Sequence, residues 1–354
     1  MKSKSIVLGS IFLAGLVFYS RGRAQQTPPF PVLKGPYLGQ TPPGPKAALF
    51  APGIVSTGMT ERAIAVSPDG REIYFELAFG RIVTIMVTKL EAGGWTEPAV
   101  APFASDGLYY HFEPCLSADG RKMFFLSNRP GAGNEPKPGW GYQHIWASDR
   151  RADGVWGEPY DLGPPINSAE AEYFPSLAAD GTLYFTRSKA SGEKPMIWRT
   201  RMTEGKYQTS EALPAAVNEQ GIPYNAFIAP DEGYLIACVD GRKDSLTPGQ
   251  PNYFVFFRDK DDRWSEGVNL GPEVNSPGAA ASAPYVTRDG NYLFFGSNRV
   301  KPFDFSARPA TSRRLLDYFS GPQNGSTDIY WIEAAFLAKL RPAAFTRPPS
   351  DSGR

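Results

Sequence analysis

The stretch Ser67-Pro68-Asp69-Gly70, with the apolar run 73–75 behind it, decides the fold, because close variants return four more times along the chain. Asp-Gly adopts positive φ at little cost, so it favours a tight turn between antiparallel strands. A short strand precedes each turn, and the continuous apolar run after it predicts a strand buried on both faces. The turn aspartates are Asp69, Asp119, Asp180, Asp231 and Asp289, and the runs are 73–75, 123–125, 183–185, 234–236 and 293–295.

Two more strands follow in these repeats. A third strand is predicted at 84–87, 144–146, 196–198, 253–255 and 328–331, and a fourth is predicted to begin at Trp95, Trp156, Tyr207 and Trp264. Four antiparallel strands per repeat is typical of a β-propeller blade. A solenoid is the alternative, but its open ends would need caps.

The two ends of the chain favour a closed ring. The last repeat stops after its third strand, at Trp331-Ile332, and the segment 48–55 resembles the outer-strand segment 159–167. We therefore expect the N-terminal segment to be the outer strand of the last blade, which removes exposed strand edges. The prediction is an all-β propeller of five blades over 47–340, or six if 301–327 contains further strands. An N-terminal extension (25–46) and a flexible C-terminal tail (341–354) complete the chain.

The first 24 residues have the pattern of a secretory signal peptide. Lys2 and Lys4 precede an apolar run over 6–19, and Gly22 and Ala24 form a small-residue cleavage site. We expect cleavage after Ala24 and a periplasmic or secreted protein; an uncleaved anchor is the alternative. No later segment is apolar for long enough to span a membrane.

Composition excludes several classes of protein. Gly 36 and Pro 34 are too many for a helical protein, and 42% hydrophobic residues are too many for a disordered one. Lys plus Arg is 37 and Asp plus Glu is 36, so binding of nucleic acid through overall charge is disfavoured. Cys115 and Cys238 fall in non-adjacent repeats, which predicts two free thiols rather than a disulfide.

Two motifs carry a resemblance to a known family. The stretch 173–181 (Tyr-Phe-Pro-Ser, three residues, Asp-Gly) and the stretch 125–129 (Phe-Leu-Ser-Asn-Arg), followed by the His144-Ile145-Trp146 strand, resemble TolB-like propeller repeats, the WD-related repeats of exported bacterial proteins. The resemblance covers about 47–332. It implies the fold, whereas its functions range over binding proteins, peptidase-associated domains and carbohydrate-active enzymes. Most TolB-like propellers have six blades, so five would depart from the pattern.

Blade topology predicts where a ligand site lies. The loops between second and third strands are long, at 130–143, 188–195, 240–252 and 300–327, and they share one rim. The starts of the first strands meet on that rim and form a central funnel. Its polar and aromatic side chains are the candidate site residues: Glu61, Arg62, His111, Glu113, Glu172, Tyr173, Tyr224 and Asn225.

An arginine recurs just after the second strand, as Arg129, Arg187, Arg242 and Arg299. A ring of guanidinium groups could bind a carboxylate or another anion. The structural alternative is that each arginine pairs with a backbone carbonyl or a carboxylate between blades.

Glu61, Glu113 and Glu172 are the candidates for paired-carboxylate catalysis, with His111 as a possible base. The structural alternative is that these side chains cap strand starts. His144 is expected to be a polar residue at a strand edge. No metal-binding or cofactor-binding motif is present, so no metal and no cofactor are expected.

Two functions remain. The favoured hypothesis is a monomeric exported propeller that binds a protein, peptide or glycan at its loop-rich face and funnel. The alternative is a carbohydrate-active enzyme, a glycoside hydrolase or polysaccharide lyase, which uses the funnel glutamates while the arginines hold an acidic sugar.

Overall fold

A computed structural model describes residues 29–131, 135, 142–189, 192–306 and 309–345. The chain divides into residues 1–31 and a second unit, 32–354, which holds all the strands. The predicted signal peptide (1–24) and the end of the predicted tail (346–354) lie outside the described residues. No helix among the described residues is long and apolar enough to cross a membrane.

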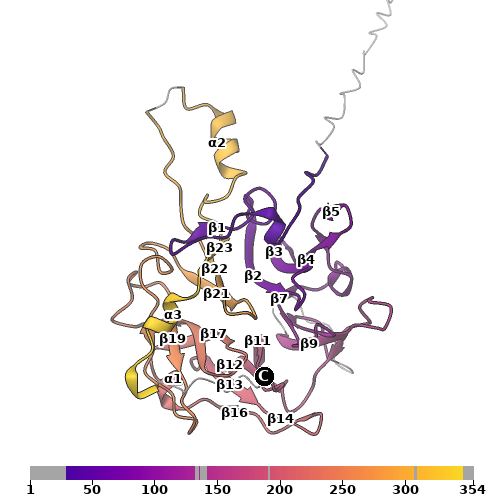
Figure 1. The fold of residues 1–354 in the computed structure, drawn as a ribbon, viewed down its shortest axis with the longest axis vertical. Coiled ribbons are helices and arrows are strands. Elements are labelled where there is room, and N and C mark those ends of the chain that lie inside the picture. Colours follow the sequence, from indigo (N-terminus) through magenta and orange to yellow (C-terminus); the bar gives the residue numbers. More distant parts are fainter. Residues whose placement is uncertain (1–28, 132–134, 136–141, 190–191, 307–308, 346–354) are drawn as a thin grey trace, which may run out of the picture. The chain divides into compact units, whose positions relative to one another are not determined.

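Five antiparallel sheets form the ring of a five-bladed β-propeller, which confirms the predicted fold class (Figure 1). The strands of each blade follow one another from the innermost to the outermost. Blade 1 is β2 (Thr60–Val66), β3 (Glu72–Phe79) and β4 (Ile82–Glu91), and β4 pairs with both β5 (Gly94–Trp95) and β6 (Ala99–Val100). Blade 2 is β7 (His111–Leu116), β8 (Lys122–Ser127), β9 (His144–Asp149) and β10 (Tyr160–Asp161).

The remaining blades repeat the order. Blade 3 is β11 (Ala171–Leu177), β12 (Leu183–Ser188), β13 (Met196–Thr200) and β16 (Glu211–Ala212), with the small hairpin β14 (Met202–Thr203) and β15 (Lys206–Tyr207). Blade 4 is β17 (Ile222–Ile228), β18 (Tyr234–Asp240), β19 (Asn252–Phe257) and β20 (Val268–Asn269). Blade 5 is β21 (Ala281–Val286), β22 (Tyr292–Ser297), β23 (Asp328–Glu333) and β1 (Ala48–Leu49).

The N-terminal strand closes the ring, as the sequence predicts. β1 pairs antiparallel with β23, with Ala48 opposite Trp331 and Leu49 opposite Tyr330. The Phe50 N–H continues the ladder by donating to the Ile329 carbonyl at 2.9 Å. Figure 1 shows the indigo β1 beside the orange β23. The first and last parts of the propeller are therefore held together through backbone hydrogen bonds.

The six-blade alternative is wrong. The tract 301–327 contains the helix α2 (Ser312–Phe319), and its described residues contain no strand. The predicted starts of the fourth strands also need correction. Trp156 and Trp264 pair across a short turn with the end of the third strand, and the outer strand begins a few residues later.

The core lies between blades rather than inside them. Successive residues of a second strand point to opposite faces, so Tyr74 packs toward blade 2 while Phe75 packs toward blade 5. An apolar cluster fills each of the five interfaces, which explains the continuous apolar runs in the sequence. Cys115 and Cys238 are free thiols, as predicted.

Residues on both sides of the predicted propeller join this core. Leu38, from η1 (Tyr37–Gly39), is buried between blades 5 and 1, and the Trp95 indole donates to the Gly35 carbonyl. After β23, α3 (Phe336–Lys339) and η3 (Ala343–Phe345) pack against blade 4, where the Arg341 guanidinium lies over the Phe257 ring. Residues 35–38 and 336–345 are therefore part of the packed second unit.

Candidate functional site

The innermost strand of every blade contains a β-bulge at the same place. The pairing register with the second strand shifts in β2, β7, β11, β17 and β21. We define the hub row as the five residues six positions before the turn aspartates: Ala63, Glu113, Phe174, Asn225 and Ala283. The first four have positive φ, at 35°, 55°, 53° and 48°, although none is glycine. A bulge of this kind redirects a side chain, and such strained residues gather at functional sites.

The hub row meets at the centre of the ring. Ala63, Phe174 and Ala283 pack together although they come from blades 1, 3 and 5. The Phe174 N–H donates to Glu113 Oε2 at 2.7 Å, and Asn225 Nδ2 donates to the Ser282 carbonyl at 2.7 Å. Side chains from non-adjacent blades make contact only where the inner strands converge, so this row forms the floor of the channel.

Two buried carboxylates at this centre share one guanidinium. Arg62 Nε donates to Glu76 Oε1 at 2.6 Å, and Arg62 Nη2 lies 3.3 Å from Glu113 Oε1. Glu76 Oε2 is buried with no partner among the described residues. Burial raises the pKa of Glu113 to about 7, with a further increase from Glu76, while Arg62 acts in the opposite direction. The pKa of Glu76 is also raised by burial.

A cavity of about 80 Å³ lies beside this floor, on the side of the ring that carries the Asp-Gly turns. All five inner strands contribute to its wall, which is mostly apolar. Pro114, Pro175 and Pro284 lie in these strands, where an innermost edge tolerates a residue without an N–H. Glu113 is the one carboxylate among the described lining residues, and Arg288 lies among the turn residues. The hollow is thus on the opposite side from the loop-rich rim that the sequence favours.

The other two candidate glutamates have a different environment. Glu61, His111 and Glu172, which we call the rim row, lie two positions before the hub row and point into the connections between blades. Glu61 accepts from the Thr57 N–H at 3.1 Å and the Thr57 hydroxyl at 2.5 Å. Burial raises the pKa of Glu61 to about 7.

Glu172 repeats the arrangement of Glu61. It accepts from the Ser168 N–H at 3.1 Å and the Ser168 hydroxyl at 2.5 Å, and Arg187 Nε adds a third bond at 2.7 Å. Burial raises the pKa of Glu172 as well. The structure does not bring Glu61 and Glu172 to the cavity that Glu113 lines.

His111 is also held within a blade connection. Its Nε2 lies 2.9 Å from Asp106 Oδ2, and Arg129 binds the same carboxylate. Burial lowers the pKa of His111, which Asp106 opposes. His144, at the start of β9, lies 3.5 Å from the Asp161 carboxylate. Among the described residues, no group of three His, Cys, Asp or Glu side chains could hold a metal ion.

Each of the four repeated arginines lies over an aromatic ring of its own blade. The Arg187 guanidinium is 4.4 Å from the Trp198 ring centre, and that of Arg299 is 4.6 Å from the Tyr330 ring centre. Arg299 donates to the carbonyls of Glu273 and Val274, Arg242 to the Gly267 carbonyl, Asp244 and Gln220, and Arg129 to Asp106. These contacts match the structural alternative stated for the arginines.

The last three candidates lie next to the hub. The Tyr173 hydroxyl is 3.1 Å from Ser188 Oγ, and Tyr224 packs against the core between blades 4 and 5. The Asn225 N–H donates to Thr186 Oγ1 at 3.0 Å, while Asn225 Oδ1 is buried without a partner among the described residues. Asn225 therefore joins Glu113 at the floor.

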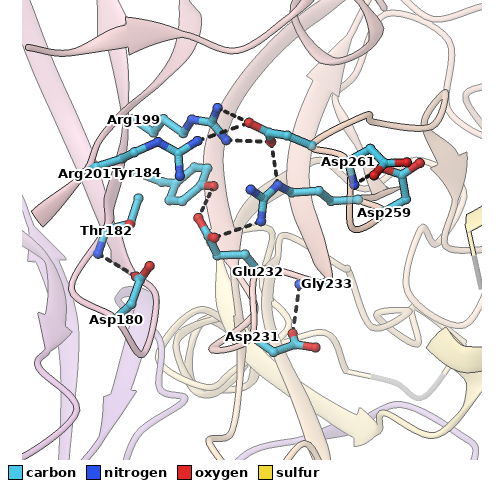
Figure 2. A network of polar contacts seen from close by, with 12 residues as sticks. Asp180, Thr182, Tyr184, Arg199, Arg201, Asp231, Glu232, Gly233, Asp259 and Asp261 are labelled. Carbon is cyan, nitrogen blue, oxygen red and sulfur yellow. Dashed lines mark hydrogen bonds and ion pairs between the residues drawn. The ribbon is translucent and has the colours of Figure 1, made fainter. Parts of the chain in front are cut away.

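Sequence reasoning missed a polar network between blades 3 and 4 (Figure 2). The Tyr184 hydroxyl donates to Glu232 at 2.5 Å, and Glu232 pairs with Arg258 at 2.8 Å. Asp262 then joins Arg258 to Arg199. The available signal was the blade 4 turn, Asp231-Glu232-Gly233, which has one residue more than the other turns. Sequence reasoning also missed Glu76, the partner of Arg62, and Asp106, the partner of His111.

Comparisons with known proteins find structural similarity but no family. No protein-family model and no curated protein match the chain. Among solved structures, it is similar to TolB from Acinetobacter baumannii, with 14% identity, a TM-score of 0.44, and coverage of 77% of this chain but 57% of TolB. It is also similar to the endo-arabinase from Bacteroides thetaiotaomicron, with 13% identity, a TM-score of 0.46, and coverage of 80% of this chain and 96% of that one. The chain is a β-propeller with structural similarity to TolB and to other propellers.

Proposed function

We propose that this propeller is a binding protein that takes an apolar side chain of an exported peptide or protein partner into the central cavity, from the side of the Asp-Gly turns. The observation that carries the proposal is the lining of that cavity: walls from all five inner strands, mostly apolar, with Glu113 as the one carboxylate among the described lining residues. A concave apolar site with a few polar groups is the usual form of a binding pocket. At about 80 Å³, the cavity suits a side chain better than a sugar ring.

Glu113 supplies the polar contact in this proposal. Its pKa of about 7 leaves a large protonated fraction near neutral pH. A protonated carboxyl group is a hydrogen-bond donor, so Glu113 can donate to a backbone carbonyl of the partner. The residues Val66, Leu116 and Leu177 provide the apolar contact around it.

The geometry gives less support to a carbohydrate-active enzyme. Glycoside hydrolysis of the usual kind needs two carboxylates that flank one bond. Glu61 and Glu172 are bonded to Thr57, Ser168 and Arg187 within the rim row. One carboxylate in the cavity is enough for binding but does not form the acid and base pair.

The proposal keeps two expectations from the sequence. The apolar run 6–19 and the site around Ala24 support export to the periplasm or the medium. The near balance of Lys plus Arg with Asp plus Glu disfavours nucleic acid as the partner. A monomer is expected.

The experiment titrates capped tripeptides, acetyl-Gly-X-Gly-amide, into the methyl-labelled full chain and follows the methyl resonances of Val66, Leu116 and Leu177 by NMR. We expect leucine or phenylalanine at X to shift these resonances, and lysine or glutamate to leave them in place. Leu177→Trp fills the cavity and should weaken binding at least tenfold. Leu315→Trp is the control, because Leu315 is exposed on α2, outside the cavity.

Two results would contradict the proposal. One is that all tripeptides leave the three methyl groups unshifted. The other is hydrolysis or elimination on a panel of oligosaccharides that is lost in Glu113→Gln, which would assign the cavity to an enzyme.

A further inference from the structure

One of the five Asp-Gly turns differs from the others at the mouth of the central cavity. The residue directly before the turn aspartate is apolar in blades 1 to 4 and charged in blade 5: Pro68, Ala118, Ala179, Pro230 and Arg288. Pro68, Pro230 and Arg288 belong to the lining of the cavity. An arginine therefore stands at a position where the repeat otherwise places a small apolar residue.

The apolar part of this mouth is held in place by contacts between neighbouring turns. The Ala179 N–H donates to the Pro230 carbonyl at 2.8 Å, which joins the turns of blades 3 and 4. A Cβ atom placed on Gly120 would lie 3.0 Å from Pro68 Cδ, so the turns of blades 1 and 2 are also in contact. The mouth is therefore formed before a ligand arrives, and such preorganisation favours affinity.

Arg288 is the one charged or hydroxyl-bearing side chain of the lining that has no hydrogen bond and no ion pair among the described residues. It is exposed, and the carboxylate beside it, Asp289, accepts from the Thr287 hydroxyl and the Asn291 N–H. The other such side chains of the lining are bonded: Glu113 to the Phe174 N–H, Ser117 to Asp119, Ser176 to the Ile228 N–H and Tyr285 to the Val66 N–H. The donors of the Arg288 guanidinium are therefore free to bind an anion.

The inner end of the cavity is closed. Ala63, Phe174 and Ala283 pack together at the floor, so a chain that enters from the turn side ends there. An internal residue of a partner would place its side chain in the cavity and bring only neutral peptide groups to the mouth. A C-terminal residue also brings a carboxylate, because its side chain and its carboxylate share one Cα. A closed apolar cavity with a free guanidinium at its mouth therefore matches a chain end.

We propose that the central cavity binds the C-terminal residue of a peptide or protein, whose apolar side chain enters the cavity and whose terminal carboxylate pairs with Arg288 at the mouth. This inference rests on the function proposed above and adds the class of ligand. A guanidinium matches a carboxylate through two parallel hydrogen bonds. Charge complementarity at the mouth then selects a free C-terminus over an internal segment of the same sequence.

The test titrates acetyl-Gly-Gly-Leu, with a free C-terminus, and its C-terminal amide into the methyl-labelled full chain and follows the methyl resonances of Val66 and Leu177. The two ligands have the same side chain and differ only in the terminal charge. We expect the free acid to bind about tenfold more tightly than the amide, because it gains the pair with Arg288. High salt should reduce this difference, since the pair is exposed to solvent.

Arg288→Met separates the two contacts. It should weaken binding of the free acid about tenfold and leave binding of the amide unchanged, so that the two ligands bind equally. The matched control is Arg121→Met, which also removes one positive charge from an exposed turn arginine but lies outside the lining. In this variant the preference for the free acid should remain.

A third ligand, acetyl-Gly-Asp-Leu-amide, moves the carboxylate to the preceding side chain and should bind no better than acetyl-Gly-Gly-Leu-amide. Binding of this ligand as tight as that of the free acid would overturn the inference, because Arg288 would then recognise an acidic side chain. Equal binding of the free acid and the amide, both lost in Leu177→Trp, would overturn the inference and leave the proposed function standing. Methyl resonances that no ligand shifts would overturn both.

Discussion

The rim row and the hub row of the inner strands lie two residues apart and hold the same kind of side chain in different settings. Glu172, in the rim row, accepts three hydrogen bonds from Ser168 and Arg187. Glu113, in the hub row of the neighbouring blade, lines the cavity and meets Arg62 at 3.3 Å. The bulge between the two positions turns the second side chain toward the centre. A carboxylate's role in this fold therefore depends on its register within the strand.

Arg62→Met should have the largest effect, because it leaves two buried carboxylates without their shared guanidinium. We expect a loss of about 3–5 kcal/mol of unfolding free energy at pH 7, the range for breaking a buried ion pair. Chemical denaturation measures it. Arg299→Met is the control from the arginine set, because among the described residues Arg299 donates to backbone carbonyls and lies over aromatic rings, and no buried carboxylate depends on it. Equal losses in both variants would remove the distinction between the centre and the blade connections.

Glu172→Ala should cost more stability than Glu113→Ala. The first variant removes partners from Arg187 and Ser168, and hydrogen bonds to charged groups are worth about 1.5–3 kcal/mol each. The second removes the acceptor of the Phe174 N–H, but it leaves Arg62 paired with Glu76 and relieves the crowding of two carboxylates. Thermal unfolding of the two variants side by side gives the order. The reverse order would mean that Glu113, rather than Glu172, is the structural residue.

The fold could be predicted from the sequence because each repeat carries its own turn and its own apolar run. Asp69-Gly70 and its four relatives fix the blade number, and the segment around Ala48 shows where the ring closes. The outer strands are misplaced by a few residues because each conspicuous Trp, such as Trp156, stands in a short turn before the strand. The helix α2 has no counterpart in the other repeats, so nothing in the repeat pattern predicts it.

The site was harder to predict because its geometry depends on the bulge and on residues outside the repeat. Glu61 and Glu172 stand eight residues before their turn aspartates and Glu113 stands six before its own, but the sequence does not show that the backbone at Glu113 has positive φ. Glu76 comes from a second strand and Asp106 from a connection, and the corresponding positions of the other blades do not repeat them. The sequence alone could not show that the cavity lies on the side of the ring that carries the Asp-Gly turns.

The pH dependence of the free energy of unfolding distinguishes Glu113, in the hub row, from carboxylates on the protein surface. The pKa of Glu113 rises from 4.5 to about 7 on folding, so the folded state holds a proton that the unfolded state has released. Its contribution to stability is complete below pH 4.5 and is lost as pH rises toward 7. The slope is at most about 1.4 kcal/mol per pH unit for one group.

Glu113→Gln should remove this part of the slope, whereas Glu61 keeps its own part, because its pKa is also about 7. Urea denaturation at pH 5, 6 and 7 gives the slope for the parent and for Glu113→Gln. Parallel curves for the two proteins would show that Glu113 does not titrate between these pH values.

Tyr173→Phe should have the smallest effect and tests the position between the two rows. The Tyr173 ring packs against Phe174 and its neighbours, and in the part of the chain that is described the hydroxyl has one hydrogen-bond partner, Ser188 Oγ at 3.1 Å. Removing one neutral hydrogen bond costs about 0.5–1.5 kcal/mol, and the ring contacts stay in place. A loss above about 3 kcal/mol would show that the Tyr173 hydroxyl supports the hub as strongly as Arg62 does. The contrast between the rim row and the hub row would then fail, because three consecutive positions of the strand would all support the hub.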